Sequence, residues 1–381
     1  MAEVNYVRGL AGVVADESRI CTIDGVKGEL YYYGYPIQVL AEKSSFMEIS
    51  FLLLNGKLPA NRQELASFEK ELSSHREIPG FVESIIKAFP KEAHPMSSLQ
   101  AVVATMGMQE PESLNDTLEG NRTRAIRLTA MFPTLVAYIH RHRMGQEFIR
   151  PRQDLSHAAN FLYMLNGQVP SAQIEKMFDI CLILHAEHTF NASTFAGRVI
   201  GSTLANLYAS VSGAVGALFG PLHGGANEMA LEMVKSIGSV EKADPWFADT
   251  VSKKKKIMGM GHRVYKTIDP RAKIIRRMLE ELAHQKGETT GLKILDRLAE
   301  LMRKKLEGTG KEIWPNVDFY SGSLYTLMGI DSINFTPIFA ISRITGWSAH
   351  ILELWSDNRL YRPKAQYVGE KDLPFLPIDA R

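Results

Sequence analysis

Helical segments separated by glycine or proline stops recur along nearly the whole chain of 381 residues, and this pattern limits the fold most strongly. Ser45 and Glu48 form a capping-box pair ahead of the apolar residues 51–54, and Gly56 supplies a C-terminal stop. Asn61 begins the next segment, in which apolar residues recur at helical spacing. The pattern predicts a mainly α-helical protein.

Two short runs near the N-terminus, residues 19–23 and 29–33, have the character of strands rather than helices. Asp24 and Gly25 lie between the runs, and these residue types are typical of tight hairpin turns. The sequence therefore predicts one small N-terminal β-hairpin ahead of an otherwise helical chain.

Residues 199–222 contain no charged side chain, and a helix of this length is long enough to cross a lipid bilayer. The stretch is only modestly hydrophobic, because serine, glycine and alanine occupy many of its positions. Small residues let helix backbones approach one another closely. We therefore expect a buried, close-packed helix in the core or at a dimer interface, and no contact with a membrane.

The charge balance and the cysteine content argue against several classes of protein. Lys plus Arg total 44 and Asp plus Glu total 42, so the net charge of +2 gives no reason to expect nucleic acid as a partner. Cys21 and Cys181 allow one disulfide but no disulfide framework, which favours a reducing cytoplasmic location. Residues 1–10 lack the apolar core of a secretory signal.

His223 lies in a turn at residues 220–225, directly ahead of a helical pattern. The positive end of a helix dipole favours the neutral imidazole, which can donate a hydrogen bond to a developing oxyanion. A histidine that merely caps the helix accounts for this segment equally well, so the local pattern alone does not decide between the two interpretations.

His262 lies in a glycine-rich segment, residues 258–266, where spaced glycines let a ligand approach the backbone closely. The Gly-x-Gly fragment is weak evidence for dinucleotide binding, because no strand-to-helix unit surrounds it. Residues 253–256 are four lysines, and such a run most often forms a solvated surface. Within and after that run, Lys256 and Lys266 are best placed to contact a phosphate group.

Three further charged residues have neighbours that suggest function. Asp318 lies between valine and phenylalanine, a setting that disfavours the carboxylate and raises its basicity, as a general base requires. An aspartate that caps the following helix fits that position as well. Arg343 interrupts an apolar helical pattern and Arg362 precedes Pro363. Since the planar guanidinium suits carboxylates, arginines near two histidines would suggest a small anionic substrate.

Cys181, His185 and His188 would share one face of a continuous helix, so a metal site is a further candidate. Their spacing matches no closed zinc signature, and no second pair of ligands follows nearby. We therefore expect no metal. A metal-dependent hydrolase built on these three residues, and a helical scaffold without chemistry, are the alternatives from other functional classes.

Taken together, these segments resemble the citrate synthase family, specifically its short bacterial type. The resemblance runs from residues 9–13 to residues 359–363 and covers nearly the whole chain. Four motifs occur in the family's order: Gly-Pro-Leu-His-Gly-Gly-Ala-Asn at 220–227, Gly-Met-Gly-His-Arg-Val-Tyr-Lys at 259–266, Asp-Pro-Arg at 269–271 and Pro-Asn-Val-Asp-Phe-Tyr-Ser-Gly at 315–322. One motif could arise by chance, but four in order leave little room for it.

The resemblance implies a multi-helical citrate synthase fold with two domains, in a homodimer whose active sites form at the subunit interface. The large helical domain would comprise residues 1–221 and 325–381, and the small helical domain residues 222–324. The uncharged helix that ends near Phe219 would lie in the dimer interface. We also expect oxaloacetate to bind first and to drive closure of the domains.

The resemblance also implies the role of each site residue. Asp318 would remove a proton from the methyl carbon of the acyl-CoA, His223 would hydrogen-bond the thioester oxygen, and His262 would polarise and protonate the oxaloacetate carbonyl. The implied oxaloacetate ligands are His188, Arg271, Arg343 and, from the partner subunit, Arg362. The implied CoA contacts are Lys256, Ile257, Met258, Gly259, Met260 and Lys266. The CoA thioester is a substrate, so no cofactor is implied.

The nearest alternative activity is that of 2-methylcitrate synthase, which uses propionyl-CoA on the same fold. Family members devoted to propionyl-CoA tend to have Leu-Asp-Trp-Phe at residues 317–320 and proline at Arg263, so the sequence favours acetyl-CoA. One methylene changes binding by only about 1–3 kcal/mol, so dual activity stays open. The sequence has no long N-terminal extension of the kind associated with NADH-regulated members, so we do not expect that regulation. The sequence does not indicate whether dimers assemble further.

Overall fold

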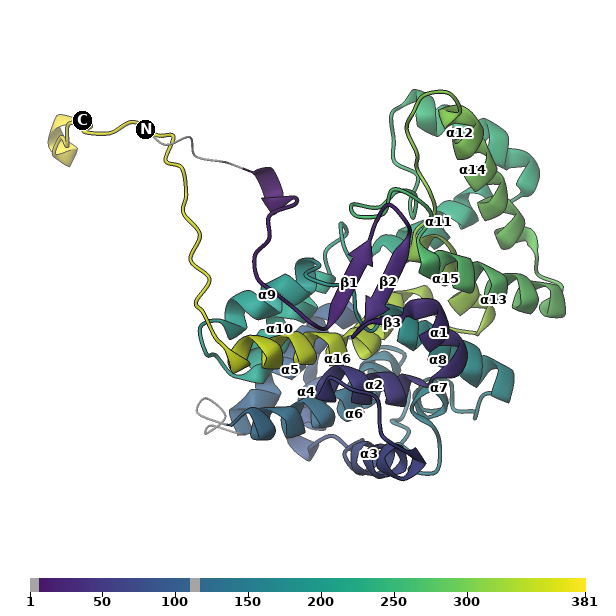
Figure 1. The fold of residues 1–381 in the computed structure, drawn as a ribbon, viewed down its shortest axis with the longest axis horizontal. Helices are drawn as coiled ribbons and strands as arrows, with labels where there is room; N and C mark the ends of the chain where they lie inside the picture. The colour runs from purple at the N-terminus through teal and green to yellow at the C-terminus, as the bar shows by residue number, and fades with distance from the viewer. Residues whose placement is uncertain (1–6, 110–116) are drawn as a thin grey trace.

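The structure is a computed structural model that describes residues 7–109 and 117–381. α-Helices dominate it, which confirms the predicted fold class (Figure 1). The helices of the first half are α1 Ile37–Lys43, α2 Phe46–Asn55, α3 Arg62–Ser74, α4 Gly80–Ala88, α5 Pro95–Met106, α6 Leu118–Arg143, α7 His157–Asn166 and α8 Ala172–His185. Those of the second half are α9 Ala192–Gly201, α10 Leu207–Leu218, α11 Ala226–Ile237, α12 Ala243–Ser252, α13 Pro270–Lys286, α14 Thr290–Leu306, α15 Val317–Leu327 and α16 Phe335–Ser356.

The N-terminal strands form a small antiparallel sheet in the order β1, β2, β3. Their bounds are β1 Cys21–Asp24, β2 Glu29–Tyr32 and β3 Tyr35–Pro36. The predicted hairpin is confirmed as β1 and β2, with Cys21 paired to Tyr32. The two-residue strand β3 was not predicted, because it is too short to show any alternation of polar and apolar residues.

The predicted helix signals in the N-terminal half lie where the sequence places them. Ser45 caps α2 by accepting a hydrogen bond from the amide of Glu48, and Gly56 ends that helix in the left-handed conformation. Asn61 caps α3 through the amide of Glu64. The capping box at α2 is only half formed, because the carboxylate of Glu48 accepts from the hydroxyl of Ser44 at 2.7 Å.

Helix α16 runs through the centre of the larger group of helices and packs against α6, α9 and α10 (Figure 1). Nearly every residue from Phe335 to Ile351 is buried, which is the burial expected of a helix enclosed on all sides. Arg343 and His350 are enclosed within this helix at 1% and 0% exposure. Buried groups of this kind require partners: Nε2 of His350 lies 3.0 Å from the carboxylate of Glu187, and Arg343 donates to the carbonyl of His185 at the end of α8.

The uncharged stretch at residues 199–222 does not form the single helix that we expected. It is divided between the end of α9 and all of α10, and Asn206 caps α10 by accepting from the amide of Ala209. The cap favours the start of a new helix at Leu207. We did not expect this start, because we took the absence of charged residues as the sign of one continuous helix. The two helices do pack closely, since a methyl group at Gly197 would lie 3.3 Å from the carbonyl oxygen of Ser210. Within the described residues, no helix is long and apolar enough to cross a membrane.

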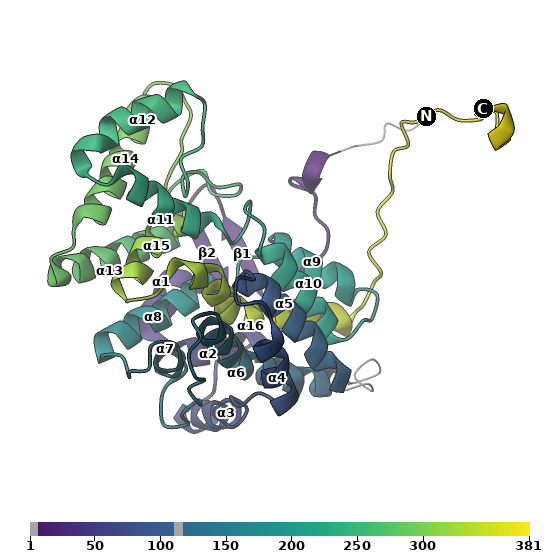
Figure 2. The same cartoon turned by 180° about the vertical axis from the view of Figure 1, so that it is seen from behind.

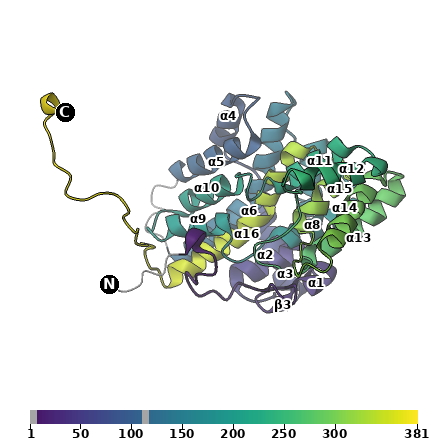
Figure 3. The same ribbon diagram turned by 90° about the horizontal axis from the view of Figure 1, so that it is seen from above.

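Helices α11 to α15 gather at one side of the molecule, as all three views show (Figures 1, 2 and 3). Among them, α13 and α11 pack on α15, and α12 packs on α14. The segment after α16 extends away from the remaining helices (Figures 1 and 3). It exposes large apolar side chains, namely Leu360, Tyr367, Val368, Leu373, Phe375, Leu376 and Ile378.

Candidate active site

The loop that carries His262 connects α12 to α13 and lies against the start of α15. Met260 forms an isolated antiparallel bridge with Pro315, and the amide of Asn316 donates to the carbonyl of Gly259 at 2.9 Å. A methyl group at Gly259 would lie 2.6 Å from the Cα of Phe319. The close approach that we expected a ligand to make at Gly259 is therefore made by the protein's own backbone, and it holds the loop beside Asp318.

The imidazole of His262 is held in one tautomer by its own loop. Its Nδ1 accepts hydrogen bonds from the amides of Val264 and Tyr265 at 3.0 and 3.1 Å. An amide can only donate, so the proton of the neutral ring lies on Nε2. Burial, aided by the charge of Arg271, lowers the pKa of His262 to about 4. At neutral pH the ring is therefore a neutral donor at Nε2.

His223 lies in the turn before α11 and faces the start of α9. Its Nε2 is 3.3 Å from the amide of Ser193 and 2.8 Å from the hydroxyl of the same residue. The amide contact makes Nε2 an acceptor, so the proton lies on Nδ1. Burial, aided by the charge of Arg343, lowers the pKa of His223 to about 4. The alternative of a capping histidine is wrong, because Gly225 is the N-cap and no side chain caps α11.

Asp318 lies in the first turn of α15, but it does not cap that helix. The cap is Asn316, whose side chain accepts from the amide of Asp318 at 3.0 Å, so the alternative of an N-cap aspartate is wrong. Burial raises the pKa of Asp318 to about 7, although the charges of Arg271 and Arg343 oppose that shift. Its Oδ1 is buried without a hydrogen-bond partner among the described residues. This carboxyl group therefore has the basicity and a free oxygen to take up a proton.

Two arginines lie beside these groups, and they differ in how their charge is satisfied. Arg271 forms a buried pair with Asp269, through Nε at 3.0 Å and Nη2 at 2.8 Å. Arg343 donates from Nε to the carbonyl of His185 at 2.6 Å, while its Nη1 is buried without a partner among the described residues. A buried, unpaired guanidinium nitrogen is costly, so an anionic group placed there would be strongly stabilised.

His188 completes the cluster from the loop between α8 and α9. Its ring centroid is 5.2 Å from that of His262, and its Nε2 is 3.4 Å from the hydroxyl of Tyr265. We expected His188 on the same helical face as Cys181, but α8 ends at His185. The helix stops there because Asn191 caps α9 and Thr189 adopts a positive φ of 51°.

The charges that act on His188 and Asp318 belong to residues far apart in the sequence. Burial lowers the pKa of His188 well below its ordinary value. Nearby charges lower it further, and these belong to Arg271, His262, Arg343 and His223. The same two arginines act on the pKa of Asp318. Five segments of the chain thus supply one cluster of three imidazoles, one carboxyl group and two guanidinium groups.

The remaining predicted site residues lie outside this cluster. Arg362 is exposed on the extended C-terminal segment, where its Nη1 donates to the carbonyl of Pro363 at 2.8 Å. The predicted CoA contacts lie along the His262 loop. Lys256 and Lys266 are exposed, Met258 and Met260 are half-buried, and Ile257 and Gly259 are buried.

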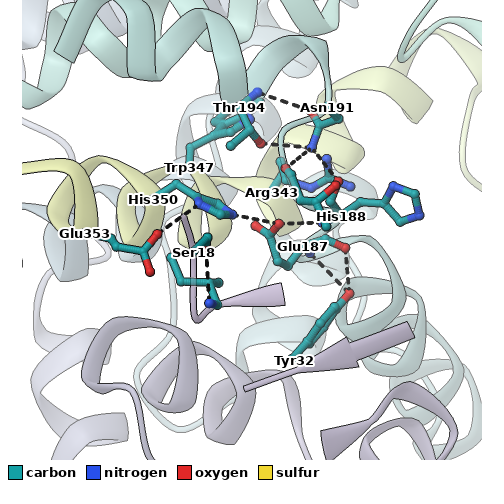
Figure 4. A network of polar contacts seen from close by, with 12 residues as sticks. Ser18, Tyr32, Glu187, His188, Asn191, Thr194, Arg343, Trp347, His350 and Glu353 are labelled. Carbon is teal, nitrogen blue, oxygen red and sulfur yellow. Dashed lines mark hydrogen bonds and ion pairs between the residues drawn. The ribbon is translucent and has the colours of Figure 1, made fainter. Parts of the chain in front are cut away.

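Sequence reasoning missed a buried polar network behind His188, which Figure 4 shows. The carboxylate of Glu187 accepts from the amide of His188 at 2.7 Å and lies 3.0 Å from Nε2 of His350. Burial alone would lower the pKa of His350, but the carboxylates of Glu187 and Glu353 together outweigh burial, so the pKa is raised. Two sequence features could have indicated this network. Glu187 directly precedes the candidate ligand His188, and His350 interrupts the apolar pattern of α16.

The residues of the metal alternative do not assemble into a site. Burial raises the pKa of the Cys181 thiol to about 12, and Nδ1 of His185 lies 2.8 Å from the Cys181 carbonyl oxygen. Within residues 7–109 and 117–381, no group of three His, Cys, Asp or Glu side chains is arranged to hold a metal ion. Cys21 and Cys181 are both buried free thiols, so the disulfide that they would allow is not formed.

Comparison with known proteins places this arrangement in a family. Residues 9–364 match the family described as citrate synthase, C-terminal domain. The chain is 46% identical over 387 residues to a citrate synthase of Acidithiobacillus ferridurans, covering 100% of both chains. It is 41% identical over 364 residues to a 2-methylcitrate synthase of Mycobacterium tuberculosis, covering 96% of this chain and 91% of that one.

A solved structure has the same architecture. It is a ternary complex of carboxymethyl coenzyme A and oxaloacetate with citrate synthase from the thermophilic archaeon Thermoplasma acidophilum. The TM-score is 0.92 at 35% identity, and the match covers 98% of each chain.

Proposed function

Because this chain belongs to the citrate synthase family, we propose that His223, His262 and Asp318 carry its reaction, the condensation of acetyl-CoA with oxaloacetate and water to citrate and CoA. The observation that carries this assignment is the cluster itself. A carboxyl group with a pKa near neutrality lies in a buried site with two neutral imidazoles of defined tautomer. That set contains one base and two donors, which an enolisation followed by an aldol-type addition requires.

Asp318 takes the proton from the methyl carbon of acetyl-CoA. The electron pair of the C–H bond moves into the new C=C bond, and negative charge develops on the thioester oxygen. A carboxylate is a weak base for such a proton, so the enolate must be stabilised where its charge appears. His223 is placed for that task, because Ser193 holds its Nε2 and leaves the Nδ1 proton to be donated.

His262 acts on the second substrate. Its Nε2 proton is donated to the ketone oxygen of oxaloacetate, which makes the carbonyl carbon more electrophilic. The enolate carbon attacks that carbon, and the proton passes from Nε2 to the new alkoxide. Water then attacks the thioester of the citryl-CoA intermediate, the C–S bond breaks as one proton of the water passes to the departing sulfur, and citrate and CoA are released. The proton that Asp318 took from the methyl carbon returns through solvent to Nε2 of His262, which restores both groups. The amides that hold Nδ1 keep the ring in the tautomer required for this donation.

Oxaloacetate is a keto-diacid, and its carboxylates require cationic partners. The unpaired Nη1 of Arg343 supports a carboxylate site there, with Arg271 and His188 beside it. We assign Arg362 to the same substrate from the partner subunit, because it lies on a segment that extends away from its own cluster (Figure 1). The CoA moiety is assigned to the loop from Lys256 to Met260 and to Lys266.

A homodimer and two domains follow from the same proposal. The apolar side chains exposed after α16, such as Leu360 at 62% and Phe375 at 85%, support docking of that segment on a second copy of the chain. We propose residues 222–324 as the small domain, since α11 to α15 lie together at one side, with residues 1–221 and 325–381 as the large domain (Figure 1). Closure on oxaloacetate would then bring the acyl-CoA to Asp318.

The choice of acyl-CoA is tested by a thiol-release assay. Purified protein with oxaloacetate receives acetyl-CoA or propionyl-CoA in separate reactions, and the two values of kcat/KM are compared. We expect the larger value for acetyl-CoA, with measurable activity on propionyl-CoA, because a pocket discriminates one methylene by only about 1–3 kcal/mol. A larger value for propionyl-CoA would instead assign the chain to the 2-methylcitrate synthase reaction. Thiol release without oxaloacetate would contradict a condensation.

A further inference from the structure

We propose that the turn of the β1–β2 hairpin, residues 25–28, fixes the loop that carries His262 and thereby positions its imidazole for the oxaloacetate carbonyl. This inference deepens the proposed function and rests on the role assigned there to His262. Gly25 and Gly28 act as positioning residues, because they do not touch the reacting atoms. Both make room for the loop, and the carbonyl of Gly25 accepts a hydrogen bond from its backbone.

The turn is a rigid support. The side chain of Asp24 accepts from the amides of Val26 and Lys27 at 3.0 and 2.9 Å, and the amide of Gly28 donates to the Asp24 carbonyl at 2.9 Å. Three hydrogen bonds to one residue thus fix the four residues that follow it. Such an Asx-type turn is held by hydrogen bonds among its own residues.

The base of the hairpin is bound to the same segment that carries His188. Tyr32 is fully buried, and its hydroxyl lies 3.1 Å from the carbonyl oxygen of Ile183 and 3.0 Å from that of Glu187. Leu30 is also fully buried. The hairpin is therefore fixed to the end of α8, and its turn has a defined position relative to the rest of the site.

The tip of the turn meets the His262 loop at the residues directly after the histidine. The amide of Lys266 donates to the carbonyl of Gly25 at 2.7 Å. A methyl group at Gly25 would overlap the carbonyl oxygen of Val264. A methyl group at Gly28 would lie 2.7 Å from Cγ2 of Thr267. At Gly25 no side chain fits unless the backbone of the loop moves, whereas at Gly28 the side chain of Thr267 is the nearest obstacle.

Val264 and Tyr265 connect this contact to the imidazole. The amides of these two residues hold Nδ1 of His262, while the carbonyl of Val264 faces Gly25. A shift of Val264 away from the turn therefore moves a donor that sets the position and the tautomer of the ring. The backbone φ of Gly25 is not positive, so close approach is the reason for glycine at that position.

The opposite side of the loop is held by the segment that leads to Asp318. The amide of Gly261 donates to the carbonyl of Trp314 at 2.8 Å, and the side chain of Asn316 donates to the carbonyl of Gly261 at 2.9 Å. The loop thus lies between two supports, one from the proposed large domain and one from the proposed small domain. The hairpin turn is the support that crosses the proposed domain boundary.

The variant Gly25→Ala tests the contact without adding backbone strain. We expect kcat to fall about tenfold or more, because a misplacement of about 1 Å at a catalytic group costs up to ~100-fold in rate. The KM for oxaloacetate should stay within about threefold of the parent value, since Arg271 and Arg343 do not touch the turn. The ketone stretch of bound oxaloacetate, read by infrared difference spectroscopy, should return toward its frequency in free oxaloacetate.

Gly80→Ala is the matched control, because its new methyl group meets no atom within 4 Å and its φ is not positive. It should leave kcat, KM and the ketone stretch unchanged. Parental kcat in Gly25→Ala would overturn the proposal. A lowered kcat with a parental ketone stretch would also overturn it, because the turn would then act on stability and not on His262.

A double-mutant cycle at Gly28 and Thr267 provides a second test. The backbone strain that alanine adds at the positive φ of Gly28 is the same with threonine or serine at residue 267, so it cancels in the comparison. Gly28→Ala should lower kcat, and Thr267→Ser, which removes the methyl group in the way, should restore part of it in the double variant. Additive effects on kcat would contradict a direct contact between turn and loop.

Failure of the proposed function can be told apart from failure of this inference. If the parent releases no CoA, the proposed function falls. Nitrogen-15 NMR of labelled histidines then still detects the contact. The chemical shifts of Nδ1 and Nε2 of His262 should change in Gly25→Ala, while those of His223 should not. Unchanged His262 signals would overturn the inference whatever the activity.

Discussion

At the scale of single residues, burial sets the protonation states on which the chemistry depends. It raises the pKa of Asp318 to about 7 and lowers those of His223 and His262 to about 4. The sequence indicated the apolar setting of Asp318. It did not indicate the tautomers of the two imidazoles, because the amides that fix them come from Ser193 of α9 and from the backbone after His262.

The pH dependence of kcat/KM should therefore have one limb near neutrality. The base must be ionised, so activity should fall as the pH drops through about 7, the pKa of Asp318. The imidazoles stay neutral down to about pH 4 and should add no limb between pH 5 and 8. Measurement of kcat/KM for acetyl-CoA over this range checks the sign. Activity that increases toward acid would contradict the assignment of Asp318 as the base.

Asp318 also links pH to stability, with the opposite sign. Its pKa in the folded chain lies above the ordinary value of 3.8, so the folded state binds the proton more tightly than the unfolded state does. This group therefore favours folding below about pH 4, and that contribution is lost as the pH rises through about 7. Replacing it by Asn should make the unfolding midpoint less sensitive to pH between 4 and 7, as thermal scans would measure.

Glu187 should act on the binding of oxaloacetate through His188. Glu187→Gln removes the charge that pairs with His350 and weakens the acceptor for the His188 amide. We expect the KM for oxaloacetate to rise about tenfold, since charge-assisted hydrogen bonds contribute about 1.5–3 kcal/mol. Glu353→Gln, which changes the carboxylate on the other side of His350, should have a smaller effect. Equal effects of the two variants on KM would contradict a specific role for Glu187.

At the scale of elements, local signals were readable where one residue alone fixes a helix end. Ser45, Gly56 and Asn61 are such cases, and each cap lies where the sequence placed it. The break between α9 and α10 was missed, because Asn206 lies in a stretch whose lack of charge suggested one continuous helix. Packing between elements cannot be inferred from spacing, since the partner of a given face is supplied by a distant segment.

Gly346 shows such a hidden contact in the middle of α16. A methyl group there would overlap the carbonyl oxygen of Ala186 and the carboxylate of Glu187. Gly346→Ala should lower the free energy of unfolding by about 1–3 kcal/mol, the usual effect of overpacking a buried site. Gly80→Ala, in open space, should change it by less than about 0.5 kcal/mol. Denaturant unfolding measures both, and equal midpoints would contradict the packing of α16 on this loop.

At the scale of the whole molecule, the order of motifs predicted the family and the helical fold, whereas the geometry between segments had to come from the structure. The cluster draws on five segments, and no sequence pattern gives their relative distances. Arg362 is the predicted oxaloacetate ligand that the single chain does not bring to the cluster. Its assignment therefore depends on the homodimer that we propose.

Subunit mixing tests that assignment. Arg362→Ala and Asp318→Asn should each be nearly inactive as homodimers. If Arg362 serves the partner's site, a heterodimer of the two variants has one site that lacks both residues and one site that is intact. Dissociated and reassociated mixtures should then recover activity in proportion to the heterodimer formed. No recovery, although heterodimers are detected by native mass spectrometry, would mean that Arg362 serves its own subunit.

The most direct measurement is the rate of CoA release by Asp318→Asn compared with the parent, at saturating acetyl-CoA and oxaloacetate. The exchange removes the base but keeps the size and the buried position of the side chain. We predict a loss of about 10²–10⁴-fold, with oxaloacetate binding by calorimetry unchanged. A folded variant that keeps more than about a tenth of the parental rate would contradict the convergence of Asp318 with His223 and His262 on one reaction.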